Sequence, residues 1–315
     1  MEAATAPSEQ DEKDEGMGTG KKVLIAVVGV IALAVILNFI FPSQGMNSEY
    51  QPQNEFMLTP WIDLKLGGLD LSINKAVFYL FIASALTVFT MVWIAKRMED
   101  KPNRVQTAVE AAYDLTKNNI AGGNMDKGLA TKWFPFIGTL FFFIWFSNMI
   151  GYLPLPTNTE HPVNILGAKI PSLALYAATA NLSVPLVLTL VVWISYHVEG
   201  VRAKGFVGYF KSWLPAGVSG AAAVPIFMIE VISQFVRIIS LSVRLFANIL
   251  AGHLLILFMG GGLVVLLGLA AAGVFTGVMA IAFFVFEVGL VATLQAFIFA
   301  TLTSIYLGGA TAAEH

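Results

Sequence analysis

The chain contains no cysteine among its 315 residues, which excludes disulfide bonds, thiol catalysis and zinc–thiolate sites. Charged residues are scarce as well, at 12% of the chain, against about 25% in a typical soluble domain. The four histidines lie at scattered positions without the spacing of metal ligands. No G-x-x-x-x-G-K-[ST] sequence is present, so the chain lacks a phosphate-binding loop for ATP.

Hydrophobic residues dominate instead, at 57% of the chain with a mean hydropathy of +0.75. Apolar runs long enough to cross a hydrocarbon core of about 30 Å recur along most of the length. The sequence therefore predicts an all-α, polytopic membrane protein with about five or six membrane helices. The net charge of −2 does not set its orientation, which depends on where lysine and arginine lie in the loops.

The N-terminal part precedes the main apolar region. Residues 1–20 are polar and acidic and are predicted to be disordered. The apolar run 23–41 then follows two lysines. Two interpretations of segment 21–42 stay open: a retained membrane helix, favoured by its length, and a cleaved signal peptide, indicated by its basic flank. Residues 43–74 are predicted to form a polar external segment.

Three further spans are predicted at 76–95, 133–153 and 173–196. The loop 96–132 carries seven lysines and arginines, and a second basic loop follows residue 196. By the positive-inside rule both loops are cytoplasmic, as are the C-terminus and, if 23–41 is retained, the N-terminus. Apolar residues at three- and four-residue spacing predict an amphipathic interfacial helix in the first loop; they are Val105, Ala108, Val109, Ala112 and Leu115.

Two unusually long apolar stretches end the chain, and no proline follows Pro225. The first, 226–259, would measure roughly 50 Å as one helix, whereas a hydrocarbon core is about 30 Å thick. The second, 263–307, is longer still. Either each stretch is broken into two shorter helices, or both are steeply tilted. We expect two long tilted helices that form a hairpin with its turn near 260–275.

Polar side chains form one stripe along the first of these stretches. At 100° per residue, Arg237 and Arg244 lie about 20° apart, and Glu230 falls within about 40° of Arg244. Asn248 lies one turn beyond Arg244 on the same side, whereas His253 points about 180° away. An arginine at a bilayer centre costs about 2.5–3.5 kcal/mol on insertion scales. We therefore expect Arg244 to serve the function of the protein.

The second stretch holds two conspicuous polar residues, Glu287 and Gln295. We expect Glu287 and His253 to be partners if the hairpin packs with its turn near the middle of 253–287. A chain of ionisable groups beside an arginine is typical of a proton path. An internal ion pair of Arg244 with Glu287 stays open as the structural alternative.

Structural roles also stay open for the other polar residues. Arg237 either reaches the membrane interface or pairs with a carboxylate such as Glu230. Asn248 and Gln295 are alternatively interhelical hydrogen-bonding residues, worth about 0.6 kcal/mol each. His253 is alternatively a core histidine whose hydrogen bonds are satisfied.

Two segments closely resemble subunit a of F-type ATP synthases: SVRLFANILAGH at 242–253 and LQAFIFATLTSIYL at 294–307. The family pattern combines R-L-F-x-N, a following A-G-[E/H] and a late L-Q-A-F-[IV]-F. The resemblance is specific over about 226–307 and extends in hydropathy over roughly 55–315. It identifies 75–315 as the subunit a membrane domain.

The resemblance implies that Arg244 is the stator arginine that faces the carboxylates of a rotating c-ring. It implies a proton path that includes Glu230, Asn248, His253, Glu287 and Gln295. Protons then cross two offset half-channels and drive ATP synthesis, while this chain is a non-catalytic subunit without ATP site, cofactor or metal. The implied partners are the c-ring, the b-subunit peripheral stalk, the rest of the ATP synthase and the lipid bilayer of a bacterial inner membrane, with no nucleic acid.

One departure from the family concerns the segment 148–154, NMIGYLP, where Gly151 replaces the acid of an N-x-x-D-x-x-P element. The competing function is a secondary transporter in which Arg244 binds an anionic substrate. Such transporters commonly show internal repeats, and the two halves of this chain show none. An assembly scaffold without conduction fits poorly with the arginine, asparagine and glutamine in the last two helices. The choice between H⁺ and Na⁺ is set largely by the ring carboxylate, which belongs to another chain.

Overall fold

The computed structural model describes most of the chain: residues 19–40, 56–99, 101–153, 163–165, 168–170, 176–215, 217–218, 220–264 and 272–312. The chain forms two compact units, of which the larger takes in 52–256 and 283–315 and the smaller 1–51 and 257–282. The expectation of a disordered N-terminus falls almost wholly outside the described residues. Residues 265–271, within the segment 260–275 expected to turn between the last two helices, also lie outside the described residues.

Within the described ranges, six helices are long and apolar enough to cross a membrane. They are α1 (Thr19–Ile40), α2 (Lys75–Arg97), α5 (Lys127–Gly151), α6 (Ser183–Lys204), α8 (Ala223–Leu257), and α10 (Ala272–Phe286) continued through η6 (Glu287–Val291) and α11 (Ala292–Thr311). This confirms the prediction of an all-α, polytopic membrane protein.

Short elements connect these helices. Two small antiparallel pairs lie before α2, where we predicted only a polar segment: β1 (Pro60–Ile62) with β4 (Ile73–Asn74), and β2 (Lys65–Leu66) with β3 (Leu69–Asp70). A third pair is β5 (Val163–Ile165) with β6 (Ala168–Ile170). The remaining short elements are η2 (Leu115–Ala121), α4 (Gly122–Asn124), η3 (Ala178–Ala180), α7 (Phe206–Lys211), η4 (Gly220–Ala222) and η5 (Phe258–Gly262).

The basic loop after α2 contains the predicted helix, α3 (Arg104–Asp114). The side chain of Asn103 accepts a hydrogen bond from the backbone N–H of Gln106 and so caps the helix. Its packing differs from the amphipathic prediction, because Val105 is 66% exposed while Gln106 is buried. Further along, Ala112 and Leu115 of the predicted apolar face do pack against the core, and Ile120 of η2 is buried in it.

The fourth span lies further along the chain than the predicted 173–196. Residues 178–180 form the separate turn η3, and α6 continues past Tyr196 to Lys204. The prediction ended the span too early because polar residues follow Tyr196. One of them, Glu199, is buried in the bundle, where it pairs with Lys132 of α5. Gly205, with φ at +73°, then separates α6 from α7.

The two C-terminal stretches form long continuous helices, which decides against the broken alternative. α8 has 35 residues, and residues 273–311 form a 39-residue helical stretch. Within the larger unit α8 and α11 run antiparallel, because Arg237 lies over the ring of Tyr306 while Gly252 lies against Glu287. η6 is a single π turn at Glu287–Val291, a feature frequent at functional sites.

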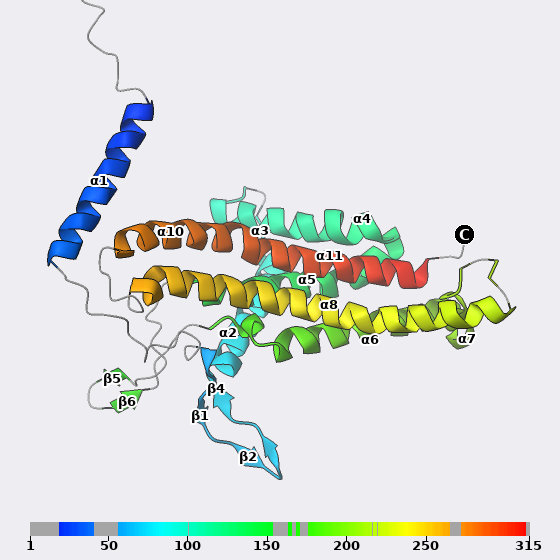
Figure 1. Ribbon diagram of the computed structural model, residues 1–315. Helices are drawn as coiled ribbons and strands as arrows, with labels where there is room; N and C mark the ends of the chain where they lie inside the picture. The colour runs from blue at the N-terminus through cyan, green and yellow to red at the C-terminus, as the bar shows by residue number, and fades with distance from the viewer. Residues whose placement is uncertain are drawn as a thin grey trace, which may run out of the picture. The chain divides into compact units, whose positions relative to one another are not determined.

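The core of the larger unit lies where α11 packs on α5 and α6 (Figure 1). Small side chains let the backbones approach closely, as is usual between membrane helices. At Gly308, for example, an added Cβ would lie 2.3 Å from the carbonyl oxygen of Asn124. The buried residues of α11 are Ala292, Gln295, Ala296, Phe299, Ala300, Thr303, Ser304, Leu307 and Ala310. α8 lies alongside α6 and α11, which it contacts through Gln234 and Arg237.

Candidate functional site

Arg244 lies on the exposed side of α8. The helix buries one face, formed by Gln234, Leu241, Ser242, Leu245, Ile249 and Gly252. Arg244 and Asn248 fall outside this face and are exposed. Ion pairs among the described residues involve Lys132, Arg202 and Arg237 but not Arg244. The alternative of an internal pair between Arg244 and Glu287 is therefore absent from the described structure.

The residues beside Arg244 on this face of α8 are small. Ser240, Ala247 and Ala251 are all exposed and lie within two turns of Arg244. These side chains and that of Asn248 are all shorter than the side chain of Arg244. We call this surface, made of Ser240, Arg244, Ala247, Asn248 and Ala251, the arginine face.

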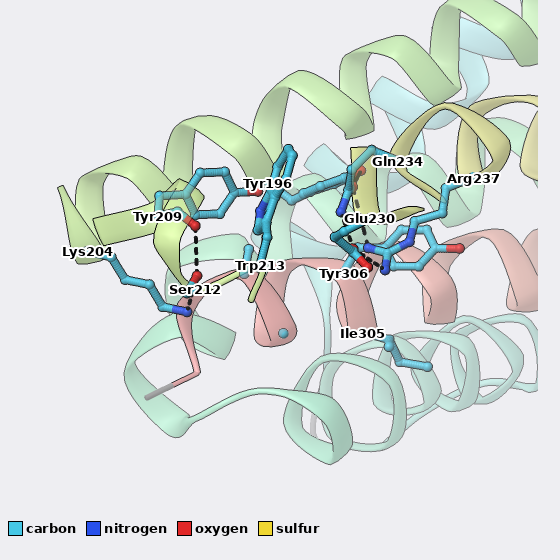
Figure 2. Close-up of a pocket in the computed structure, with 12 residues that line it drawn as sticks. Tyr196, Lys204, Tyr209, Ser212, Trp213, Glu230, Gln234, Arg237, Ile305 and Tyr306 are labelled. Carbon is cyan, nitrogen blue, oxygen red and sulfur yellow. Dashed lines mark hydrogen bonds and ion pairs between the residues drawn. The ribbon is translucent and has the colours of Figure 1, made fainter. Parts of the chain in front are cut away.

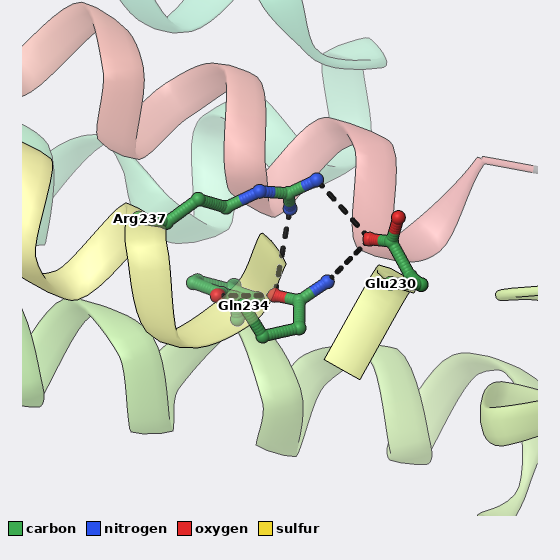
Figure 3. A network of polar contacts seen from close by, with 4 residues as sticks. Glu230, Gln234 and Arg237 are labelled. Atoms are coloured by element: carbon green, nitrogen blue, oxygen red, sulfur yellow. Dashed lines mark hydrogen bonds and ion pairs between the residues drawn. The ribbon is translucent and has the colours of Figure 1, made fainter. Parts of the chain in front are cut away.

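Arg237 behaves differently from Arg244, because it pairs within the chain (Figure 3). Its Nη2 atom lies 3.3 Å from Oε1 of Glu230, and Nε2 of Gln234 donates to the same oxygen at 2.7 Å. The hydroxyl of Tyr196 donates to Oε1 of Gln234 at 2.7 Å, and the guanidinium lies 5.3 Å from the centre of the Tyr306 ring. Of the two open interpretations of Arg237, the pair with Glu230 is the one observed.

This network opens onto a cavity of about 410 Å³ between α6, α7, α8 and α11 (Figure 2). Its lining is mostly polar and includes Tyr196, Lys204, Tyr209, Ser212, Trp213, Glu230, Gln234, Arg237 and Tyr306. Lys204 donates to the hydroxyl of Ser212 at 3.2 Å. Burial raises the pKa of the Tyr209 phenol, so this hydroxyl stays protonated at neutral pH. The cavity thus offers hydroxyl groups and three charged side chains to water.

A second polar cluster lies nearer the other end of α8 and centres on Tyr152. The hydroxyl of Tyr152 donates to Oε2 of Glu287 at 3.0 Å. Its ring stacks on the imidazole of His253, with 4.3 Å between the ring centres. We predicted His253 and Glu287 as direct partners, and they instead meet through Tyr152. His253 binds the carbonyl oxygen of Ile249 through Nδ1, at 2.8 Å, while Nε2 is buried without a partner in the described structure.

Two glycines make room for this cluster. A Cβ added at Gly151 would lie 2.5 Å from Nε2 of His253, and one added at Gly252 would lie 2.3 Å from Oε2 of Glu287. The imidazole therefore occupies the space beside Gly151, where the family pattern has an acid. The departure at Gly151 has a physical reason: a side chain there would displace His253.

Asn148 ties the same region together, although it was not among the predicted site residues. It is fully buried, accepts a hydrogen bond from the hydroxyl of Thr179 at 2.6 Å and donates to the carbonyl oxygen of Ala292 at 3.1 Å. Gln295, one turn after Ala292, is also buried. Asn148 thereby fixes α11 next to its π turn at Glu287.

The structure divides the predicted site residues into three places. Arg244 and Asn248 lie on the arginine face, Glu230 lies in the cavity network, and His253 and Glu287 lie around Tyr152. The predicted site residues did not include Tyr152, Tyr196 and Gln234. Tyr152 had a signal, since it directly follows Gly151 in the segment that departs from the family pattern. The described residues contain no group of three histidines, aspartates or glutamates that could hold a metal ion.

Comparison with known proteins shows the family to which the chain belongs. The family model for the ATP synthase A chain matches residues 77–308. ATP synthase subunit a of Rubrobacter xylanophilus is 36% identical over 255 residues, which cover 80% of this chain and 90% of the relative. Those of Hyphomonas neptunium and Frankia alni are 33% and 32% identical, over 84% and 88% of this chain and 96% and 91% of the relatives. The chain belongs to the ATP synthase subunit a family and is an integral membrane subunit of the F0 sector of that complex.

Proposed function

We propose that this subunit moves protons through two offset half-channels at its interface with a rotating c-ring, and so couples the proton-motive force to ATP synthesis. The observation that carries the proposal is Arg244, exposed on a membrane-crossing helix and without an acidic partner among the described residues. An unpaired guanidinium within a bilayer is costly. A carboxylate supplied by another subunit would remove that cost.

The chemistry of Arg244 suits this role. A guanidinium stays charged at all working pH values, so it favours the ionised form of a carboxylate that comes near it. Its fixed charge also repels protons that would otherwise pass directly from one half-channel to the other. The small side chains of the arginine face allow a ring helix to approach closely. Protons then cross only while bound to the ring, which turns as they move.

The two polar clusters support two separate half-channels. Glu230 and His253 are 23 positions apart in the sequence, about 35 Å along a helix, and Arg244 lies between them. The Glu230 cavity would open one half-channel. His253, Tyr152 and Glu287 offer an imidazole, a phenol and a carboxyl group in series for the other, with Asn248 and Gln295 beside the path.

The distribution of basic residues supports an orientation. Lys204 lies at the cavity, and the basic loop after α2 precedes α5, so we assign this end of the bundle and both termini to the cytoplasm of a bacterial cell. In this assignment α1 is retained as a helix additional to the subunit a domain at 75–315, and 43–74 is external. The c-ring and the b-subunit peripheral stalk are the proposed partners.

The proposal is tested with Arg244→Ala in inverted membrane vesicles that contain the complete complex. ATP-driven proton pumping, followed with a pH-sensitive dye, is expected to be abolished while ATP hydrolysis remains. Arg104→Ala, at an exposed position of α3, is the matched control and should pump normally. Normal coupled pumping by Arg244→Ala would contradict the proposal and favour the transporter alternative. That alternative has less support, because Arg237, and not Arg244, lines the polar cavity.

A further inference from the structure

The wall of the polar cavity carries an excess of positive charge. Lys204 and Arg237 are its two basic residues and Glu230 its single acid (Figure 2). A metal cation binds where oxygen ligands and negative charge are available. Of the residues that line the cavity, only Glu230 supplies negative charge. Whether a metal ion can settle there depends on whether this carboxylate is free.

One oxygen of this carboxylate, Oε1, is not free, because both Arg237 and Gln234 bind it. Nη2 of Arg237 lies 3.3 Å from Oε1 of Glu230, and Nε2 of Gln234 donates to the same atom at 2.7 Å (Figure 3). The guanidinium is itself kept in place by the ring of Tyr306, 5.3 Å away, and by Oε1 of Gln234, 3.5 Å from its Nη1. Tyr196 fixes Gln234 in turn with a hydrogen bond of 2.7 Å.

We propose that Arg237 is a specificity-determining residue that keeps metal cations out of this cavity while protons pass. The inference rests on the proposed function, in which the cavity opens one half-channel. A fixed guanidinium repels Na⁺ and K⁺, and by pairing with Oε1 of Glu230 it offsets the negative charge that would attract them. A proton needs no vacant coordination site, because it moves between water molecules and hydroxyl groups. The hydroxyls that line the cavity belong to Tyr196, Tyr209, Ser212 and Tyr306.

The test is Arg237→Gln in the complete ATP synthase, reconstituted in proteoliposomes and driven by ATP. Proton pumping is measured as Na⁺ rises from about 1 to about 100 mM on both sides, with choline holding the ionic strength constant. Each rate is compared with that of the same variant at low Na⁺. The pumping rates of the wild type and of Arg237→Lys are expected to stay constant as Na⁺ rises. Arg237→Gln is expected to slow about five-fold or more, because Glu230 is then free to hold Na⁺.

The double variant Arg237→Gln/Glu230→Gln is the matched control. It lacks both the guanidinium and the carboxylate, so its residual pumping should again be independent of Na⁺. Pumping by Arg237→Gln that is as independent of Na⁺ as the wild type would overturn the inference. Inhibition that persists in the double variant would overturn it too, because Na⁺ would then act elsewhere.

A second variant covers the case in which Arg237→Gln does not assemble. Tyr306→Leu keeps Arg237 but removes the ring that positions it, and should show intermediate inhibition by Na⁺; unchanged pumping would count against the inference. Failure here is distinguishable from failure of the proposed function. If only the inference about Arg237 fails, pumping still depends on Arg244. If the proposed function fails, Arg244→Ala pumps normally at any Na⁺ concentration.

Discussion

Tyr152 joins two side chains that do not bond to each other directly. Its hydroxyl donates to Glu287, and its ring stacks on His253. The two contacts use different parts of the side chain, so they can be separated by substitution. Tyr152 thus positions both the acid and the imidazole that we assign to one half-channel.

Tyr152→Phe removes the hydroxyl and keeps the stacked ring. A hydrogen bond to a carboxylate contributes about 1.5–3 kcal/mol, so ATP-driven pumping is expected to fall about ten-fold while the complex still assembles. Tyr113→Phe is the control, because the ring of Tyr113 packs edge-on against Phe134 at 5.0 Å and its hydroxyl has no hydrogen bond to any residue that the structure describes. Equal pumping by the two variants would remove Tyr152 from the proton path.

At the site, the sequence could predict relations within one helix but not contacts between helices. Helical spacing predicted that His253 and Arg244 point to different sides, because both residues lie on the same helix. It could not show that Tyr152, a hundred residues earlier, would stand between His253 and Glu287. Nor could it decide between the interpretations of Arg237, since the ring of Tyr306 comes from another helix.

The helices that carry the site are held by close packing, of which the contact between α11 and α4 at Gly308 is an example. A Cβ at Gly308 would lie 2.3 Å from the backbone oxygen of Asn124, whereas one at the neighbouring Gly309 meets nothing within 4 Å. A backbone oxygen cannot move aside as a flexible side chain can. The contact between α11 and α4 therefore depends on a missing side chain.

The two adjacent glycines provide a matched pair of variants. Gly308→Ala is expected to destabilise the subunit by about 1–3 kcal/mol through overpacking. Gly309→Ala should leave stability unchanged or slightly raised, since alanine has the higher helix propensity. The measurement is the thermal aggregation midpoint of the purified complex. Equal midpoints for the two variants would show that α11 can shift away from α4.

Elements were predictable where hydropathy alone determines them. The long apolar stretches predicted α2 and α8 close to their observed bounds, whereas α5 begins six residues before the predicted 133 and the last helical stretch is 273–311 instead of 263–307. The prediction failed for α6, whose polar end is buried through the pair of Glu199 with Lys132. It also missed the short hairpins before α2, since strands of two or three residues leave no periodic pattern.

The molecule as a whole presents a surface that its own residues do not complete. Helices α6 and α11 pack against the buried face of α8, while the arginine face stays exposed in the described structure. In a membrane an exposed guanidinium needs a partner. The proposed function therefore requires a partner helix with a carboxylate that lies against the arginine face.

Cross-linking measures that contact directly, and the chain suits it because it contains no native cysteine. A cysteine introduced as Ala251→Cys is paired with one placed beside the carboxylate of the c subunit in the intact complex. Ile239→Cys, 62% exposed on a different side of α8, is the control. We predict an oxidative cross-link from position 251 that blocks pumping, and little or none from position 239. A cross-link from position 239 alone would contradict the account.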